Sequence, residues 1–249
     1  MKSVRNLMSN RETEINAFFD LLDFMHQHNK RGLPTIFSNE TSENPATFNL
    51  ESQHLHMLTA TAYLLLYNYV EAVVTQCLEA LSKKIKTEQK SILEFTETIQ
   101  KEWVVQKILP NDQSINVERI ITRIINEFKT IHSQIDDLKI SKGGGGNFDN
   151  EAIHKLCDRL CINFKTSRKI SENLHRYKDY AFSEKKMSFM KEVRDFRNKL
   201  AHGELSFMEL GRNCQIDRLN HTKQVIFDYM ESFIDSVESH INEKGFLQS

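Results

Sequence analysis

Residues that interrupt helices are scarce in this chain and occur in only a few places. The 249 residues include 3 prolines and 8 glycines, and four of the glycines form one run, from Gly143 to Gly146. The long segments between these interruptions can therefore form continuous helices. Hydrophobic residues make up 39% of the chain and charged residues 27%, which is typical of a soluble globular protein. We expect an all-α helical bundle in one domain, residues 1–249, with the glycine run as a flexible hinge near residues 141–148.

Apolar residues that recur at helical spacing predict where the helices lie. The predicted helices span residues 3–29, 51–84, 91–108, 116–138, 149–160, 166–180, 183–201 and 217–244. Residues 32–52 are polar and contain two prolines, so we expect a loop there, and a second loop over residues 204–215. Asp149 is expected to cap the start of its helix, and Gly203 to end the preceding helix in a left-handed conformation.

The predicted helix over residues 51–84 is apolar on most of its surface, which indicates burial in a core or in a dimer seam. Glu71 is the only charged residue in its central part. A buried carboxylate is costly unless it is paired, and Arg194 and Arg197 are the cationic candidates on a later helix. We interpret Glu71 as a supporting residue that orients one of these arginines. The alternative is that Glu71 reaches the solvated edge of its helix.

A short motif combines two residues that are suited to phosphodiester chemistry. Arg197 and His202 are five positions apart, with Asn198 after the arginine and Gly203 after the histidine. An imidazole can move a proton near neutral pH, and a guanidinium carries a permanent charge on a planar fork that fits phosphate oxygens. Together they are sufficient in principle to cut a phosphodiester without a metal. The alternative is a solvated arginine and a histidine that favours the dipole at a helix C-terminus.

The segment that ends on this motif is basic, although the whole chain has a net charge of only −1. Residues 165–199 contain eleven Lys/Arg and five Asp/Glu, a local charge of +6, so the remainder of the chain carries −7. A phosphate-bearing substrate requires such a segment. The candidate RNA-binding side chains are Lys185, Lys186, Lys191 and Lys199. The alternative for each lysine is a solvated helix face.

Three stretches of the sequence resemble one known group of proteins. Val193–Gly203 resembles the signature of the HEPN superfamily, R-x4–6-H with a polar residue next to the arginine. Leu66–Glu71 and Gly146–Asp149, the latter ahead of a helix ending in Cys161-Ile162, are similar to stretches of bacterial, toxin-like HEPN proteins. The three stretches occur in the order that such proteins show, so the similarity covers most of the chain.

The resemblance implies a fold and an activity. It implies a HEPN-like helical bundle with additional helices, a two-fold homodimer, and a metal-independent endoribonuclease that needs no cofactor. Arg197, Asn198 and His202 would be the catalytic residues. Some HEPN toxins also carry a tyrosine two places after the histidine, which a partner nucleotidyltransferase modifies. Here that position is Glu204, which argues against this form of control.

The spacing of the motif raises a geometric problem. Five positions on an ideal helix turn about 500°, so Arg197 and His202 point about 140° apart. Either the helix ends at Ala201 and His202 swings back, or two copies meet about a two-fold axis and each site uses groups from both chains. The resemblance favours the second solution. His202 would then act on the ribose 2′-OH or the leaving 5′-oxygen, Arg197 would stabilise the developing charge, and Asn198 would hold a phosphate oxygen or the histidine.

These observations favour a ribonuclease of a toxin or antiviral, abortive-infection-like system. Its substrate would be RNA, cut by attack of the 2′-OH, and an antitoxin or defence-system protein is a candidate partner. Two alternatives stay open: a catalytically inactive HEPN-like module that binds RNA or protein, and an unrelated helical scaffold.

The cysteines and the apolar segments indicate a cytoplasmic protein. Cys157 and Cys161 are four apart on a predicted helix with only His154 nearby, so the four cysteines are expected to be core thiols and not zinc ligands. No signal peptide is visible at the N-terminus. The most apolar stretch, residues 55–70, is shorter than the ~20 residues that a bilayer span needs. We expect no membrane association.

Overall fold

The computed structural model describes residues 1–30, 50–108, 117–143, 147–170 and 189–248. The centre of the predicted glycine hinge, most of the predicted loop over 32–52 and most of the predicted helix over 166–180 lie outside these residues. So do Lys185 and Lys186. Within the described residues the chain is helical, with two isolated β-bridges as the only extended pairings. The predicted all-α class is confirmed.

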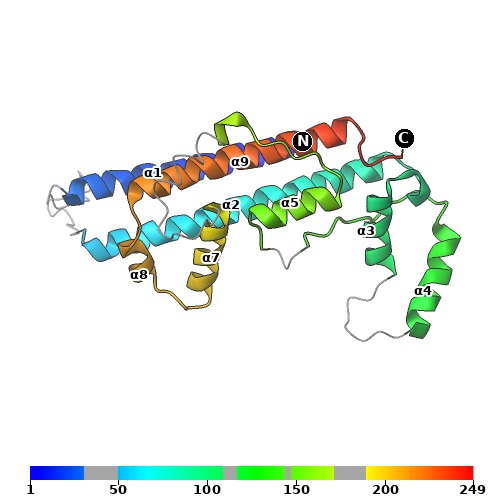
Figure 1. Cartoon of the computed structure of the whole chain (residues 1–249), viewed down its shortest axis with the longest axis horizontal. Coiled ribbons are helices and arrows are strands. Elements are labelled where there is room, and N and C mark those ends of the chain that lie inside the picture. Colours follow the sequence, from blue (N-terminus) through cyan, green and yellow to red (C-terminus); the bar gives the residue numbers. More distant parts are fainter. Residues whose placement is uncertain (31–49, 109–116, 144–146, 171–188, 249) are drawn as a thin grey trace, which may run out of the picture. The chain divides into compact units, whose positions relative to one another are not determined.

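The described helices follow one another along the chain as labelled in Figure 1. Their bounds are α1 Lys2–Lys30, α2 Ser52–Thr87, the 3-10 helix η1 Ile92–Glu94, α3 Glu97–Lys107, α4 Val117–Thr130, α5 Asn150–Arg159, α7 Phe189–Ala201, α8 Phe207–Arg212 and α9 Ile216–Asn242. The sequence predicted α1, α2, α5 and α9 to within a few residues. Asp149 caps α5 as predicted, since its Oδ1 accepts a hydrogen bond from the backbone N–H of Ala152 at 2.8 Å.

The predicted helix over residues 91–108 was wrong, because a break divides it. Ser91 and Glu94 form a capping box that closes the single turn of η1. Phe95 is then extended and fully buried, and it packs against the ring of Phe246. Burial of this ring holds the chain out of the helical conformation until α3 begins at Glu97.

The predicted helix over residues 116–138 was also wrong in its extent, because α4 ends at Thr130. The following segment is extended, and the backbone N–H of Ile140 donates to the Ser82 hydroxyl at 3.1 Å. Leu138 and Ile140, two residues apart, are both buried, which is the spacing of an extended strand-like segment and not of a helix.

The predicted loop over residues 204–215 contains a helix that the sequence analysis missed. Ser206 and Glu209 form a capping box, in which the Glu209 backbone N–H donates to the Ser206 hydroxyl at 3.1 Å. This box starts α8, which has only six residues. So short a helix produces no clear apolar periodicity, so the cap was its only sequence signal.

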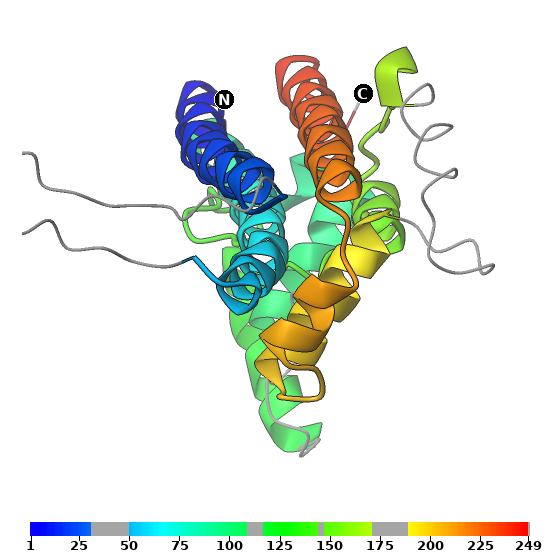
Figure 2. The same cartoon turned by 90° about the vertical axis from the view of Figure 1, so that its left-hand side faces the viewer.

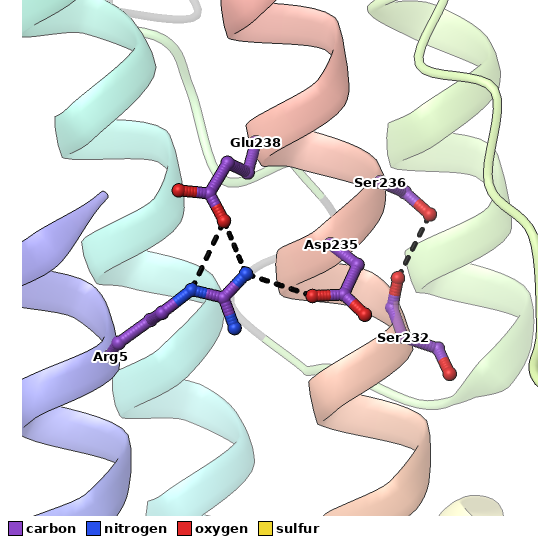
Figure 3. A network of polar contacts seen from close by, with 5 residues as sticks. All are labelled: Arg5, Ser232, Asp235, Ser236 and Glu238. Carbon is purple, nitrogen blue, oxygen red and sulfur yellow. Dashed lines mark hydrogen bonds and ion pairs between the residues drawn. The ribbon is translucent and has the colours of Figure 1, made fainter.

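The described chain divides into two compact units, and the first comprises residues 1–5, 71–166 and 231–249. Figure 3 shows a polar network within it, in which the Arg5 guanidinium binds Asp235 at 2.8 Å and also Glu238. In the same view the Ser236 hydroxyl donates to the backbone oxygen of Ser232. The two carboxylates raise the pKa of Arg5. These contacts tie the start of α1 to the end of α9 within this unit.

The second unit, residues 6–70 and 167–230, contains α7 and α8 with parts of α1, α2 and α9. In Figure 2, which shows the helices nearly end-on, α1 and α9 lie side by side above α2. The contact between α1 and α9 includes Asn220, whose amide donates to Asp23 at 2.9 Å, and Lys223, whose ammonium lies over the ring of Phe19. The expectation that residues 1–249 fold as one domain stays a prediction.

The part of α2 in the second unit explains its apolar composition, because many of its apolar side chains are buried. The buried residues include Leu55, Ala60, Ala62, Tyr63, Leu66, Tyr67, Tyr69 and Val70. Among the described helices, α2 is long and apolar enough to cross a membrane, by length and composition alone. The core helix of a soluble protein meets the same criteria. More than half of the most apolar 18-residue window of α2 is buried within the protein.

Candidate active site

Helix α7 carries the Arg/His motif and packs one side into the second unit. Phe189, Met190, Val193 and Leu200 are buried, and the Phe189 ring contacts the ring of Tyr229. This apolar side of α7 is therefore core packing. Phe196 is half-buried, and its ring meets the edge of Tyr63 at 5.0 Å between centroids. The remaining faces of α7 carry the polar side chains.

The end of α7 has the hydrogen-bond pattern of a Schellman motif, which confirms the predicted role of Gly203. Gly203 has a φ of +71°, in the left-handed region. Its N–H donates to the oxygen of Leu200 at 3.3 Å, and the N–H of Glu204 donates to the oxygen of Lys199 at 2.9 Å. These two bonds satisfy carbonyl groups that the end of a helix would otherwise leave unbonded.

The backbone of His202 still follows the helical path of α7. The helix ends at Ala201, as one of the two proposed solutions required, but the His202 N–H still donates to the Asn198 oxygen at 2.9 Å. Its Cα therefore follows the helix, and the chain turns only at Gly203. His202 consequently does not swing back, and its side chain leaves α7 about 140° from Arg197. The two-copy arrangement stays a prediction.

The His202 ring is exposed, and among the described residues no side chain forms a hydrogen bond or an ion pair with it. An imidazole in this state can accept and donate protons without first breaking an intramolecular contact. Such availability is what a general acid or base needs before substrate binds.

Arg197, in contrast, is half-buried, and its guanidinium contacts Tyr67 and Asn198 among the described residues. Its Nη1 donates to Oδ1 of Asn198 at 2.8 Å, and its Cζ lies 4.5 Å from the centroid of the Tyr67 ring. The sequence predicts a phosphate oxygen or the histidine as the partner of Asn198. In this structure Asn198 contacts the arginine, and its roles toward substrate and histidine stay predictions. Tyr67 lies within the Leu66–Glu71 stretch, but the sequence alone predicted no role for it.

Arg194 and Glu71, the predicted supporting residues, each have an ion-pair partner other than the predicted one. Arg194 binds the carboxylate of its neighbour Asp195, with Nη2 and Oδ1 2.7 Å apart. Glu71 belongs to the first unit, where its carboxylate lies 3.7 Å from the ammonium of Lys142. The Glu71 side chain is 33% exposed, so it is less buried than the sequence suggested. Its pairing with Arg194 or Arg197 stays a prediction.

The two described candidate RNA-binding lysines, Lys191 and Lys199, are exposed. On an ideal helix they lie about 20° and 60° from His202, whereas Arg194 lies about 60° from Arg197. The polar surface of α7 therefore has a lysine–histidine side and an arginine side. Asn198 lies between them, about 40° from His202.

A buried ion pair holds α7 in the second unit, and the sequence analysis missed it. The Arg218 guanidinium of α9 binds the carboxylate of Glu192 on α7, and both residues are buried. Charged residues on helices usually face solvent, so nothing in the sequence distinguished this pair. The nearby Tyr63 hydroxyl and Cys214 thiol lie 3.2 Å apart, and burial raises the pKa of both groups.

The burial of the cysteines differs from the prediction that all four are core thiols. Cys77 and Cys157 are buried, and burial raises the pKa of each thiol to about 12. Cys161 is exposed, because α5 ends at Arg159 and Cys161 follows in a left-handed conformation. The predictions that Cys161 lies on the same helix as Cys157 and that it is a core thiol were therefore wrong. Among the described residues no three His, Cys, Asp or Glu side chains gather as a metal site would require.

These features define a class of protein. It is all-helical in its described residues, and the end of one helix carries an arginine in contact with neighbouring side chains and an exposed histidine. A family model described as MAE_28990-like HEPN matches residues 2–246. The chain belongs to this HEPN family, which confirms the resemblance seen in the motif. No curated protein and no solved structure matches the chain significantly.

Proposed function

We propose that this chain is a metal-independent endoribonuclease of the HEPN type, acting as a two-fold homodimer. The observation that carries the proposal is the contrast between the two motif residues. Arg197 is held by Tyr67 and Asn198, and His202 is exposed and available on a different side of α7. Arg197 would stabilise the developing charge, and His202 would transfer protons. Phosphodiester cleavage needs both functions.

The proposed reaction uses the ribose of the substrate as nucleophile. A histidine accepts the proton of the 2′-OH, and the 2′-oxygen forms a bond to phosphorus. The bond between phosphorus and the 5′-oxygen breaks, and the leaving oxygen takes a proton from a protonated histidine. The products are a 2′,3′-cyclic phosphate and a 5′-hydroxyl. DNA lacks the 2′-OH and would not be cut. Arg197 stabilises the negative charge that grows on the phosphate oxygens.

The homodimer is proposed because one α7 does not direct both groups to one phosphate. In the dimer each site would take its arginine from one copy and its histidine from the other. The proposed seam includes α7 or the stretch of α2 from Leu55 to Leu81. Light scattering that shows a monomer at high micromolar concentration would remove this part of the proposal.

The proposed biological setting is a toxin or antiviral system in the cytoplasm. RNA is the substrate, and an antitoxin or another defence protein would be the partner that restrains the enzyme. Lys191 and Lys199, with Lys185 and Lys186, would bind the RNA backbone. The family match supports a HEPN-type function, and the basic segment over residues 165–199 supports a nucleic-acid substrate.

The test is cleavage of total RNA by the purified protein in the presence of EDTA. The His202→Ala variant should be inactive, and His132→Ala is its matched control because His132 is also exposed but lies outside the motif. Cleavage that EDTA abolishes would contradict the metal-independent mechanism. A dimer that binds RNA but does not cut it would indicate the inactive RNA-binding module instead.

A further inference from the structure

Arg197 is in contact with an aromatic ring that is almost completely buried. Tyr67 lies in α2 and is 1% exposed, and the Arg197 Cζ is 4.5 Å from its ring centroid. The neighbours of Tyr67 in α2, Leu66 and Val70, are buried as well. The ring is therefore a rigid surface, whereas a free arginine side chain samples many rotamers.

The ring and Asn198 both restrain the guanidinium. Asn198 accepts a hydrogen bond from Nη1, and Cζ lies over the face of the Tyr67 ring. A cation over a ring face is attracted by the electron-rich face of the ring. This attraction helps to fix the position of the group.

That geometry suits a residue that must bind a phosphate. The N–H donors of arginine can bind two phosphate oxygens in a fork. The ring carries no negative charge of its own that would neutralise the guanidinium. Groups held in place before the reaction stabilise developing charge better than groups that must reorganise.

We propose that Tyr67 is a positioning residue that holds the Arg197 guanidinium by its ring face, ready for the phosphate. The inference rests on the proposed ribonuclease function, and it adds a residue on a different helix to the site. Tyr67 does not touch the reacting atoms, so its effect passes through Arg197.

Three substitutions test how Tyr67 affects the rate of RNA cleavage. Tyr67→Phe keeps the ring face and should cut RNA within about threefold of the wild-type rate. Tyr67→Leu removes the ring and should lower the single-turnover rate at saturating RNA about tenfold. Tyr69→Leu is the matched control: Tyr69 is equally buried two residues further along α2, but its hydroxyl binds Glu12 and its ring packs on Phe227. Tyr69→Leu should cut RNA at the wild-type rate at temperatures below its unfolding.

A fluorinated series separates the cation contact from packing. Phenylalanine analogues with one, two and three fluorine atoms, incorporated at position 67, keep the shape of the ring and lower the negative potential of its face stepwise. The rate should fall with each fluorine. This series also decides the question if Tyr67→Leu fails to fold. Equal rates across the series, or equal rates for Tyr67→Leu and Tyr69→Leu, would overturn the proposal.

A measurement without RNA distinguishes failure of this inference from failure of the proposed function. The Nε–H resonance of Arg197, assigned with Arg197→Lys, should be shifted by the ring current of the aromatic side chain at position 67. The shift should persist in Tyr67→Phe and disappear in Tyr67→Leu. A wild-type protein that does not cut RNA would overturn the proposed function alone. An Arg197 resonance that Tyr67→Leu leaves unchanged would overturn the positioning role.

Discussion

Glu192 on α7 and Arg218 on α9 form an ion pair whose side chains are only 8% and 3% exposed. Glu192 precedes Arg197 by five residues on the same helix, so the pair fixes the helix that carries the motif within the second unit. Pairs buried to this degree lose much hydration, which their attraction offsets only while both partners are present.

Removing one partner of this pair should therefore be costly. We expect Glu192→Ala and Arg218→Ala each to lower the free energy of unfolding by about 3–5 kcal/mol, because each leaves a buried charge without its counter-charge. The double variant Glu192→Met with Arg218→Met should be much less destabilised. Urea denaturation measures both. As a control, Lys101→Ala breaks the exposed pair with Glu97 and should change stability little. Equal losses for the buried and exposed pairs would contradict this account.

Gly211 should not tolerate any side chain. A Cβ built on Gly211 of α8 would overlap the backbone carbonyl of His56 in α2, and neither backbone can move without separating the helices. We expect Gly211→Ala to lower the free energy of unfolding by about 3 kcal/mol or more.

Gly203 provides the comparison for Gly211, because a Cβ there meets open space. Its φ of +71° makes Gly203→Ala cost about 1–2 kcal/mol through backbone strain alone. Gly203→Asn should cost less, because asparagine adopts this conformation more readily. Thermal unfolding should rank Gly211→Ala as the more damaging change, and the reverse order would contradict the close helix contact.

How much of this site the sequence could predict depends on the kind of residue. Arg197 and His202 could be proposed as site residues because the sequence around them resembles the HEPN motif, and Gly203 could be predicted because few residues end a helix in the left-handed region. Glu192 was not identifiable, because a glutamate on a helix normally faces solvent and only tertiary packing buries it. Tyr67 looked like core packing, and only its contact with Arg197 gives it a further role.

The difference between local sequence signals and tertiary packing also explains which helices the sequence predicted correctly. The long helices α1, α2 and α9 were predicted well because their apolar periodicity extends over many turns. The end of α4 was predicted eight residues too late, at 138 instead of Thr130, since the isoleucines beyond it are apolar in either conformation. Burial of Ile135, Leu138 and Ile140 in an extended segment depends on neighbours distant in sequence, which periodicity does not detect.

His240 should make stability depend on pH. Burial lowers its pKa below the ordinary value of 6.5, and Glu243 opposes the shift only in part. The unfolded chain therefore takes up a proton near pH 6.5 while the folded protein does not, so the free energy of unfolding should decrease as the pH falls from about 6.5 toward the folded pKa. The slope for one group is at most about 1.4 kcal/mol per pH unit. His240→Gln should remove this slope between pH 5 and 7, and the exposed His132→Gln should retain it.

Glu71 should affect cleavage more than its ion-pair partner Lys142 does. If the Glu71 carboxylate orients Arg194 or Arg197, Glu71→Ala should lower the cleavage rate and Glu71→Gln should be milder, because glutamine keeps a hydrogen-bond acceptor. Lys142→Ala removes the other charge of the pair seen at 3.7 Å and should leave the rate unchanged. Single-turnover assays on RNA measure all three. Equal rate losses for Lys142→Ala and Glu71→Ala would assign Glu71 to the lysine pair.

A mixing experiment should show whether each site uses both chains. Arg197→Ala and His202→Ala homodimers should both be inactive, since loss of a positioned acid or base typically costs about 10²–10⁴-fold. When the two variants are unfolded together and refolded, about half of the dimers are mixed, and one of the two sites in each mixed dimer has an intact Arg197 from one chain and an intact His202 from the other. We expect about a quarter of the wild-type cleavage rate to return. His202→Ala refolded alone is the control and should stay inactive. If each site instead used the arginine and histidine of a single chain, every site would lack one of the two residues, and the mixture would remain as inactive as its components.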